Sequence, residues 1–142
     1  METQGSHRAD SPEDLVAREL ARLRDLAGAN ENLVFRGRFL TTECLIGTFS
    51  RDVYLSIANG RVQHVIPGPK LMRPWAFAYR AAPEAWLEFW RPMPRPGSHD
   101  LLALTKTGAA RLEGNLHPFL ANLQYFKDLL ALPRRCVAEG RQ

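Results

Sequence analysis

The sequence predicts an α+β domain in which helices cover one face of a mostly antiparallel sheet. Three observations support this class. Residues 51–58 alternate apolar and polar side chains, and Asn59-Gly60 follows them as a hairpin signal. Leucines recur at helical spacing near the N-terminus, and a longer apolar stripe has the same spacing near the C-terminus. Helices that flank a run of strands, instead of alternating with them, are typical of this class.

The chain of 142 residues has the length of one domain. We expect residues 1–10 to be a disordered tail, residues 11–133 to fold as one domain, and residues 134–142 to be a basic tail. Hydrophobic residues make up 45% of the chain and charged residues 24%, which is typical of a soluble globular protein. We recognise neither a secretory signal nor a segment apolar enough to cross a bilayer, so we expect a cytoplasmic protein.

A helix is predicted to begin at Ser11, because serine is a favoured N-cap and Pro12 suits the first helical position. The helix runs to Gly28, and its apolar face consists of Leu15, Leu20, Leu23 and Leu26. Residues 33–39 are then expected to form a strand, in which Phe35, Gly37 and Phe39 share one face.

The next strands are predicted to form an antiparallel meander. Residues 41–49 are apolar and β-branched enough for a strand, although a helical turn also fits them. Residues 51–58 and 61–66 flank the Asn59-Gly60 turn and are expected to pair across it. Residues 75–79 alternate aromatic residues with alanines, which favours an edge strand with one aromatic face and one small face.

Two short helices, a strand and a long helix are expected to complete the domain. A helix at residues 83–90 opens with a proline, and Ser98 is expected to cap a second helix at 100–107. A last strand at 109–114 follows. The long helix then runs from 117 to Pro133, and its apolar stripe consists of Leu116, Phe119, Leu120, Leu123, Phe126 and Leu130.

An unusual number of large aromatic residues falls between positions 75 and 90. They are Trp75, Phe77, Tyr79, Trp86, Phe89 and Trp90. Tryptophan is often found where an apolar wall meets a polar opening, so the cluster favours a ligand cavity, with plain core as the other interpretation. Three arginines close to the cluster in sequence are candidates for holding a charged head group at the mouth of that cavity: Arg73, Arg80 and Arg91.

The formal net charge is +4, from nineteen basic and fifteen acidic residues. A cluster of basic residues with interleaved aromatic ones would indicate a nucleic-acid partner, but the basic residues here are scattered along the chain, so we expect none. They either form the solvated faces of ordinary elements or attract the chain weakly to an anionic membrane surface.

No arrangement of residues indicates catalysis. The sequence lacks paired C-x-x-C motifs, the spaced histidines of zinc proteases, the G-x-S-x-G elbow and the phosphate-binding loop. His99 and Asp100 are adjacent, so on a helix they point about 100° apart and cannot act together as a base and its orienting acid. We expect no enzyme activity, no catalytic residue, no metal site and no cofactor. A small enzyme with His99 or His64 as its base stays open as an alternative.

The C-terminal third resembles the end of the sterol carrier protein type 2 domain. The residues that carry this resemblance are Leu101-Leu102-Ala103-Leu104, Gly108, Arg111-Leu112-Glu113-Gly114-Asn115 and Phe119-Leu120-Ala121-Asn122-Leu123. Earlier in the chain, the spacing of Leu55, Ile57, Asn59-Gly60 and Val62 is similar to the strand, glycine turn and strand of that family. The resemblance covers roughly residues 30–132 and rests on apolar positions and glycine turns. It implies five strands, with helices on one face that enclose an apolar tunnel.

The resemblance also implies non-enzymatic binding or carriage of a fatty acid, acyl-CoA, sterol or phospholipid. The tunnel lining carried over from the family is Phe39, Val53, Leu55, Ile57, Leu101, Leu102, Leu104, Phe119, Leu120, Leu123 and Phe126. From the aromatic cluster we add Trp75, Phe77, Trp86 and Trp90 as ligand-binding candidates. This tryptophan-rich segment departs from the family pattern, and its rings are large enough to fill the tunnel. The alternative function is therefore an accessory or scaffold protein, bound to a partner enzyme of a lipid or quinone pathway, that does not transfer lipid.

Overall fold

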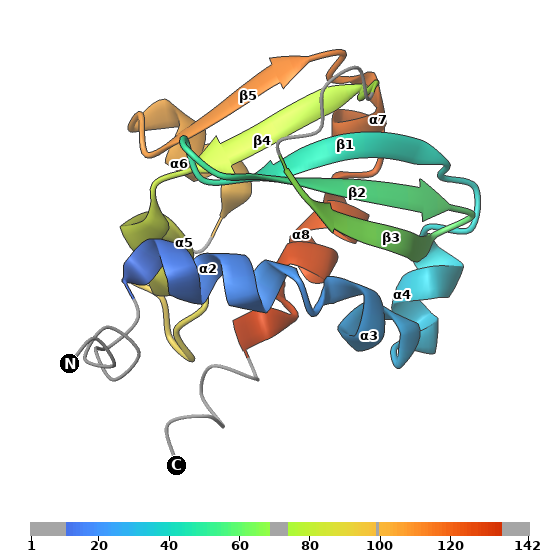
Figure 1. The fold of residues 1–142 in the computed structure, drawn as a ribbon, viewed down its shortest axis with the longest axis horizontal. Coiled ribbons are helices and arrows are strands. Elements are labelled where there is room, and N and C mark those ends of the chain that lie inside the picture. The colour runs from blue at the N-terminus through green and yellow to red at the C-terminus, as the bar shows by residue number, and fades with distance from the viewer. Residues whose placement is uncertain (1–10, 69–73, 99, 135–142) are drawn as a thin grey trace, which may run out of the picture.

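The computed structural model describes residues 11–68, 74–98 and 100–134, so the predicted tail at 1–10 and all of the predicted tail at 134–142 except Arg134 lie outside it. Five strands form one sheet, and helices lie on one side of it (Figure 1). The elements in chain order are α2 (Pro12–Leu20), α3 (Leu23–Gly28), α4 (Glu31–Arg36), β1 (Thr42–Gly47), β2 (Asp52–Ala58), β3 (Arg61–Pro67), β4 (Phe77–Ala81), α5 (Pro83–Phe89), α6 (Leu101–Lys106), β5 (Ala110–Gly114), α7 (His117–Ala121) and α8 (Leu123–Ala131).

The strand order is β3-β2-β1-β4-β5. The pairs β1–β2, β2–β3 and β4–β5 are antiparallel, and only β1–β4 is parallel. The predicted α+β class and the mostly antiparallel sheet are therefore confirmed. The predicted meander corresponds to β1, β2 and β3, which follow one another along the chain and across the sheet.

The turn between β2 and β3 is the hairpin that the sequence predicts. Asn59 and Gly60 both have positive φ, at 51° and 82°, as a two-residue hairpin turn of this type requires. Glycine is also required for space at the second position. A Cβ on Gly60 would lie 2.5 Å from the carbonyl oxygen of Val34, in α4. The turn therefore fixes the position of α4 against the end of the sheet.

The main core lies between the sheet and the helices, as Figure 1 shows for α2, α3, α5 and α8 below the strands. A second, smaller apolar cluster lies on the other face of the sheet and consists of Leu45, Tyr54, Ala78 and Ile66. Strand residues alternate between these two faces, so Phe77 and Tyr79 belong to the helix-covered side.

Near the N-terminus, two predictions are wrong. The expected single helix is broken at Ala21-Arg22 into α2 and α3. The expected strand at 33–39 is mostly helix α4, because the Asn30 side chain caps that helix by accepting the Leu33 N–H at 3.0 Å. The alternation of Phe35 and Phe39 does not mark a buried face, since both side chains are exposed.

Three further details differ from expectation. β4 is not an edge strand, because β1 and β5 flank it and Ala78 on its small face is fully buried. Asp100, not Ser98, caps α6 by accepting the Leu102 N–H. The long final helix is divided at Asn122 into α7 and α8. Among the described residues, no helix has the length and apolar character needed to span a membrane.

Candidate functional site

The space between sheet and helices is filled by aromatic rings. Eight aromatic side chains with at most 2% exposure lie there: Phe77, Tyr79, Trp86, Phe89, Trp90, Phe119, Tyr125 and Phe126. Their rings touch one another, with centroids 5.3 Å apart for Trp86 and Trp90 and 5.4 Å apart for Phe77 and Phe119. The structure thus brings five of the predicted ligand-binding residues together as one cluster, in contact with each other.

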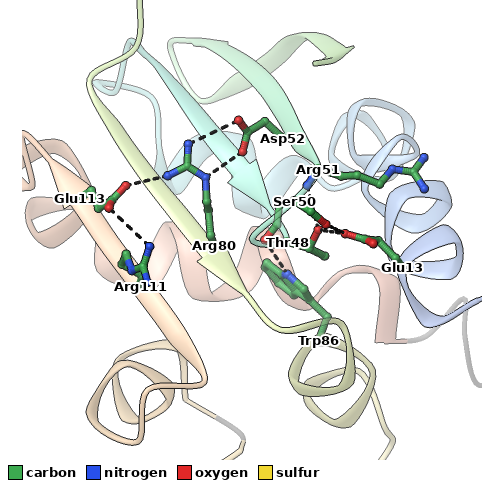
Figure 2. Close-up of polar contacts among 10 residues, drawn as sticks. Glu13, Thr48, Ser50, Arg51, Asp52, Arg80, Trp86, Arg111 and Glu113 are labelled. Carbon is green, nitrogen blue, oxygen red and sulfur yellow. Dashed lines mark hydrogen bonds and ion pairs between the residues drawn. The ribbon is translucent and has the colours of Figure 1, made fainter. Parts of the chain in front are cut away.

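The polar ends of these rings are bonded to the backbone. The indole N–H of Trp86 donates to the carbonyl oxygen of Gly47 at 3.0 Å, and Figure 2 draws this bond as a dashed line from the Trp86 ring. The indole N–H of Trp90 donates to Leu130 at 2.7 Å, and the Tyr79 hydroxyl donates to Leu101 at 2.7 Å. Burial raises the pKa of Tyr79, so the hydroxyl keeps its proton and remains a donor. These bonds hold the rings in single positions.

The other predicted lining residues are divided between interior and surface. Five are buried beside the aromatic cluster: Val53, Leu55, Ile57, Leu101 and Leu104. Leu102 and Leu123 are half-buried against the same core. Phe39 is 87% exposed, Leu120 is 49% exposed and Trp75 is 38% exposed. The structure therefore does not place these last three in the interior.

Two of the three predicted head-group arginines, Arg80 and Arg91, are bound to acidic side chains. Arg80 lies on the face of the sheet that carries Ala78, and it bridges Asp52 at 2.8 Å and Glu113 at 2.6 Å (Figure 2). Its hydrogen bond to Asp52 raises the pKa of the Arg80 guanidinium. Arg91 is exposed and pairs with Glu88 at 3.2 Å. Arg73 lies outside the described residues.

The start of α2 is tied to the turn between β1 and β2. The hydroxyls of Thr48 and Ser50 both donate to the carboxylate of Glu13 (Figure 2). These two bonds lower the pKa of Glu13, because they stabilise its charged form. The same turn is connected to the aromatic cluster, because Gly47, at the end of the strand that leads into it, accepts the indole N–H of Trp86.

An open groove lies between the α3–α4 segment and the end of α8. It consists of two hollows of about 860 and 340 Å³, which share Asn30, Asn32, Ala131 and Leu132. Leu26, Ala29 and Pro92 add further apolar lining to the larger hollow. None of the eight interior aromatic residues is among the described lining residues of either hollow. The groove is thus separate from the interior cluster.

Arg134, the first residue of the predicted basic tail, lies in the wall of this groove. Two nitrogens of Arg134 donate to the carbonyl oxygen of Phe89, at 2.7 and 3.1 Å, and its guanidinium lies 5.1 Å from the centre of the Phe89 ring. Burial lowers the pKa of Arg134. Within residues 11–68, 74–98 and 100–134, no carboxylate forms an ion pair with it. A signal in the sequence was its position just after the last helix, where a cation is favoured.

Of the two histidines considered as catalytic bases, His64 and His99, only His64 lies in the described part of the chain. His64 is exposed on β3, in register with Ser56 on β2. His99 lies outside the described residues. In the described part of the chain, no group of three histidine, cysteine or acidic side chains is placed to hold a metal ion.

No protein-family model and no curated protein matches this sequence. Several solved structures do resemble it in fold, among them the following three. The crystal structure of sterol carrier protein 2 has a TM-score of 0.65 at 12% identity, over 82% of this chain and 94% of that one. A conserved hypothetical protein from Thermus thermophilus, described as a candidate sterol carrier protein, has a TM-score of 0.54 at 15% identity, over 81% and 85%. UbiJ-SCP2, a ubiquinone synthesis protein, has a TM-score of 0.44 at 19% identity, over 84% and 85%.

The first two matches show that this chain has the sterol carrier protein 2 fold. The fold that the sequence resemblance implies is therefore confirmed, with the five strands and the one helix-covered face.

Proposed function

We propose that this protein binds an apolar molecule with an anionic head group, without catalysing a reaction, in the groove between α4 and the end of α8. The observation that carries the proposal is the larger hollow, of about 860 Å³. Small-molecule sites typically measure roughly 300–1,000 Å³. Leu26, Ala29 and Leu132 supply apolar wall, and each CH₂ that a ligand buries there contributes about 0.8 kcal/mol. A fatty acid or another acyl lipid is the class that fits.

Arg134 is the residue that favours an anionic head group on the ligand. It is half-buried, and two of its nitrogens are held by Phe89, which fixes the direction of the guanidinium. A bound carboxylate or phosphate would return the charge stabilisation that burial removes. The acidic side chains of Asp25 and Glu31 also line the hollow, but both are exposed, so water screens their repulsion of the head group.

The groove is favoured over the interior tunnel because the interior is already filled. A lipid between sheet and helices would have to displace rings such as Trp86 and Trp90, which are at most 1% exposed and are each hydrogen-bonded. Close-packed interiors do not accept an added ligand without such displacement. The groove instead already has a hollow of about 860 Å³.

Native mass spectrometry of the full chain, purified without detergent, tests the proposal, followed by solvent extraction of whatever is bound. We expect a co-purifying lipid, or saturable uptake of oleic acid, with the lipid recovered at unchanged mass. Ala131→Trp fills the groove and should abolish this binding. Ala121→Trp, at an exposed position at the end of α7, is the matched control and should bind normally. Equal binding by both variants would show that the ligand lies elsewhere.

The head-group assignment has a separate test. Arg134→Met should weaken the binding of a fatty acid about tenfold or more, in line with the loss of a charge-assisted hydrogen bond. It should leave the binding of the matching fatty alcohol unchanged. Arg22→Met is the control, because it removes an exposed arginine that is not among the described lining residues of the groove. Equal losses for acid and alcohol would mean that Arg134 only shapes the groove.

A second candidate is an accessory protein that uses this fold without binding lipid. The filled aromatic interior favours it. The two candidates differ when the protein is titrated with fatty acids, acyl-CoA and sterols. A protein that stays free of ligand throughout, with the Ala131→Trp variant behaving like the parent, would support the accessory role and remove the first proposal.

A further inference from the structure

Two phenylalanines point into solvent where α4 ends. Phe35 is 64% exposed and Phe39 is 87% exposed. Arg38 lies between them in sequence, and its guanidinium is 3.9 Å from the centre of one ring and 4.7 Å from the other. We call these three residues the aromatic tip. Figure 1 shows α4 and the β2–β3 turn together at one end of the long axis of the molecule.

The aromatic tip stands on a rigid support. A Cβ on Gly37 would lie 2.5 Å from the Tyr125 ring, so the backbone between the two phenylalanines is pressed against α8. The Gly60 N–H donates to the carbonyl oxygen of Leu40 at 3.0 Å, and the Tyr125 hydroxyl donates to that of Gly60 at 2.8 Å. The exposed rings are thus held out by packed structure and are not the result of a loose segment.

The surroundings of the aromatic tip are basic. The Arg38 side chain lies at the surface, with one nitrogen donating to the carbonyl oxygen of Phe35. Arg61 is exposed and directly follows Gly60 in the supporting turn. Arg36 is adjacent in sequence and is paired with Asp128. The whole chain also carries a net charge of +4. Such a surface complements an anionic one.

The apolar area decides between a protein and a membrane as the occupant. Two phenylalanines of about 200 Å² each, at these exposures, offer roughly 300 Å² of apolar surface. A stable protein interface takes about 800 Å² from each partner. A small protruding apolar tip with arginine beside it is instead suited to the boundary between lipid head groups and acyl chains, where such side chains insert to a shallow depth.

We propose that the aromatic tip docks this protein on an anionic bilayer, with Phe35 and Phe39 inserted among the acyl chains and Arg38 against lipid phosphates. The proposal does not depend on whether the groove binds a ligand. It concerns the surface that meets the membrane, and binding to that surface is measured independently of ligand uptake.

The test is co-sedimentation of the full chain with vesicles of phosphatidylcholine, either alone or mixed with phosphatidylglycerol. We expect binding to the mixed vesicles only, and a loss of at least tenfold in the partition coefficient for Phe39→Ser combined with Phe35→Ser. Arg38→Gln should lose about fivefold, as for one basic residue near a charged surface. The control is Phe49→Ser, because Phe49 is 44% exposed and lies near an arginine in the same way, with Arg111 at 5.2 Å.

Circular dichroism of each variant confirms that it is folded, which is expected because the substituted side chains are exposed. The proposal is overturned if the parent protein ignores both kinds of vesicle, or if Phe49→Ser loses as much binding as the double variant. It is also overturned if the aromatic tip instead mediates self-association, seen as a dimer that the double variant dissolves.

Discussion

Replacing Trp90 by alanine tests the central structural observation, that the interior is filled. Trp90 is fully buried and its ring is stacked on Trp86. Truncation of a buried Trp or Phe to alanine costs about 3–5 kcal/mol. The carbonyl oxygen of Leu130 also loses its indole donor. If this oxygen stays buried without a donor, the loss of stability grows by about 1 kcal/mol or more. We expect a total loss of about 4–6 kcal/mol in the free energy of unfolding.

Urea unfolding followed by circular dichroism measures this loss, and thermal unfolding should show a midpoint lower by roughly 15 °C, at about 3–4 °C per kcal/mol for this size. Trp75→Ala is the matched control, because that tryptophan is 38% exposed and should cost under about 1 kcal/mol. If Trp90→Ala does not fold, Trp90→Phe is used instead, because it keeps an aromatic ring and removes the indole N–H. It should lose about 1–3 kcal/mol of stability.

The cavity left by Trp90→Ala should also take up indole. A ligand at ten times its dissociation constant returns about 1.4 kcal/mol of stability, so added indole should raise the unfolding midpoint of this variant and leave the parent unchanged. A loss under about 1 kcal/mol, equal to that of Trp75→Ala, would refute the reasoning. It would mean that an open tunnel already surrounds Trp90.

Three other substitutions have defined outcomes. Gly60→Ala should lose about 2 kcal/mol or more in urea unfolding, because φ is +82° and the new Cβ would lie 2.5 Å from the Val34 oxygen, whereas Gly28→Ala, with open space around it, should change little. Glu13→Gln should lose less than about 1 kcal/mol at neutral pH, since Glu13 is only half-buried and water screens its interactions. Folding lowers the pKa of Glu13, so its contribution is present above the ordinary value of 4.5 and is lost as pH falls through the lower folded value; the parent and the variant should therefore converge in acid. Arg80→Met should cost about 1 kcal/mol after solvent screening, because it removes the cation that bridges Asp52 and Glu113, and it should not change lipid affinity; a reduced affinity for charged lipids alone would restore Arg80 as a head-group residue.

The parts of the fold that the sequence predicts well have local causes. Asn59-Gly60 sets a two-residue turn because both positions must adopt positive φ, and the flanking strands then follow in register. Pro83 begins α5 because its ring fixes a helical φ. In each case the deciding interaction lies within a few residues along the chain, so the sequence pattern contains it.

One error, at α4, has a local cause, and the others arise where distant contacts decide. The alternation of Phe35 and Phe39 has the spacing of a strand, but Asn30 starts a helix there and neither ring is buried. The alternation at β4 shows that its two faces differ, but it contains no information on the number of neighbouring strands. No pattern along the chain connects Arg134 to Phe89, so the groove was not predictable before folding brought α5 and α8 together.

The parallel pairing of β1 with β4 has a consequence for the rate of folding. Cys44 in β1 pairs with Phe77 in β4, and the whole β2–β3 hairpin lies between these two residues in the sequence. The two strands can therefore pair only when the chain closes a long loop. Hairpins with short turns close within microseconds, whereas pairings between distant segments are slow. We therefore expect β1, β2 and β3 to assemble first, leaving one side of β1 as an unprotected edge until β4 arrives. An open edge of that kind invites pairing with another chain, so refolding yield should fall as protein concentration rises.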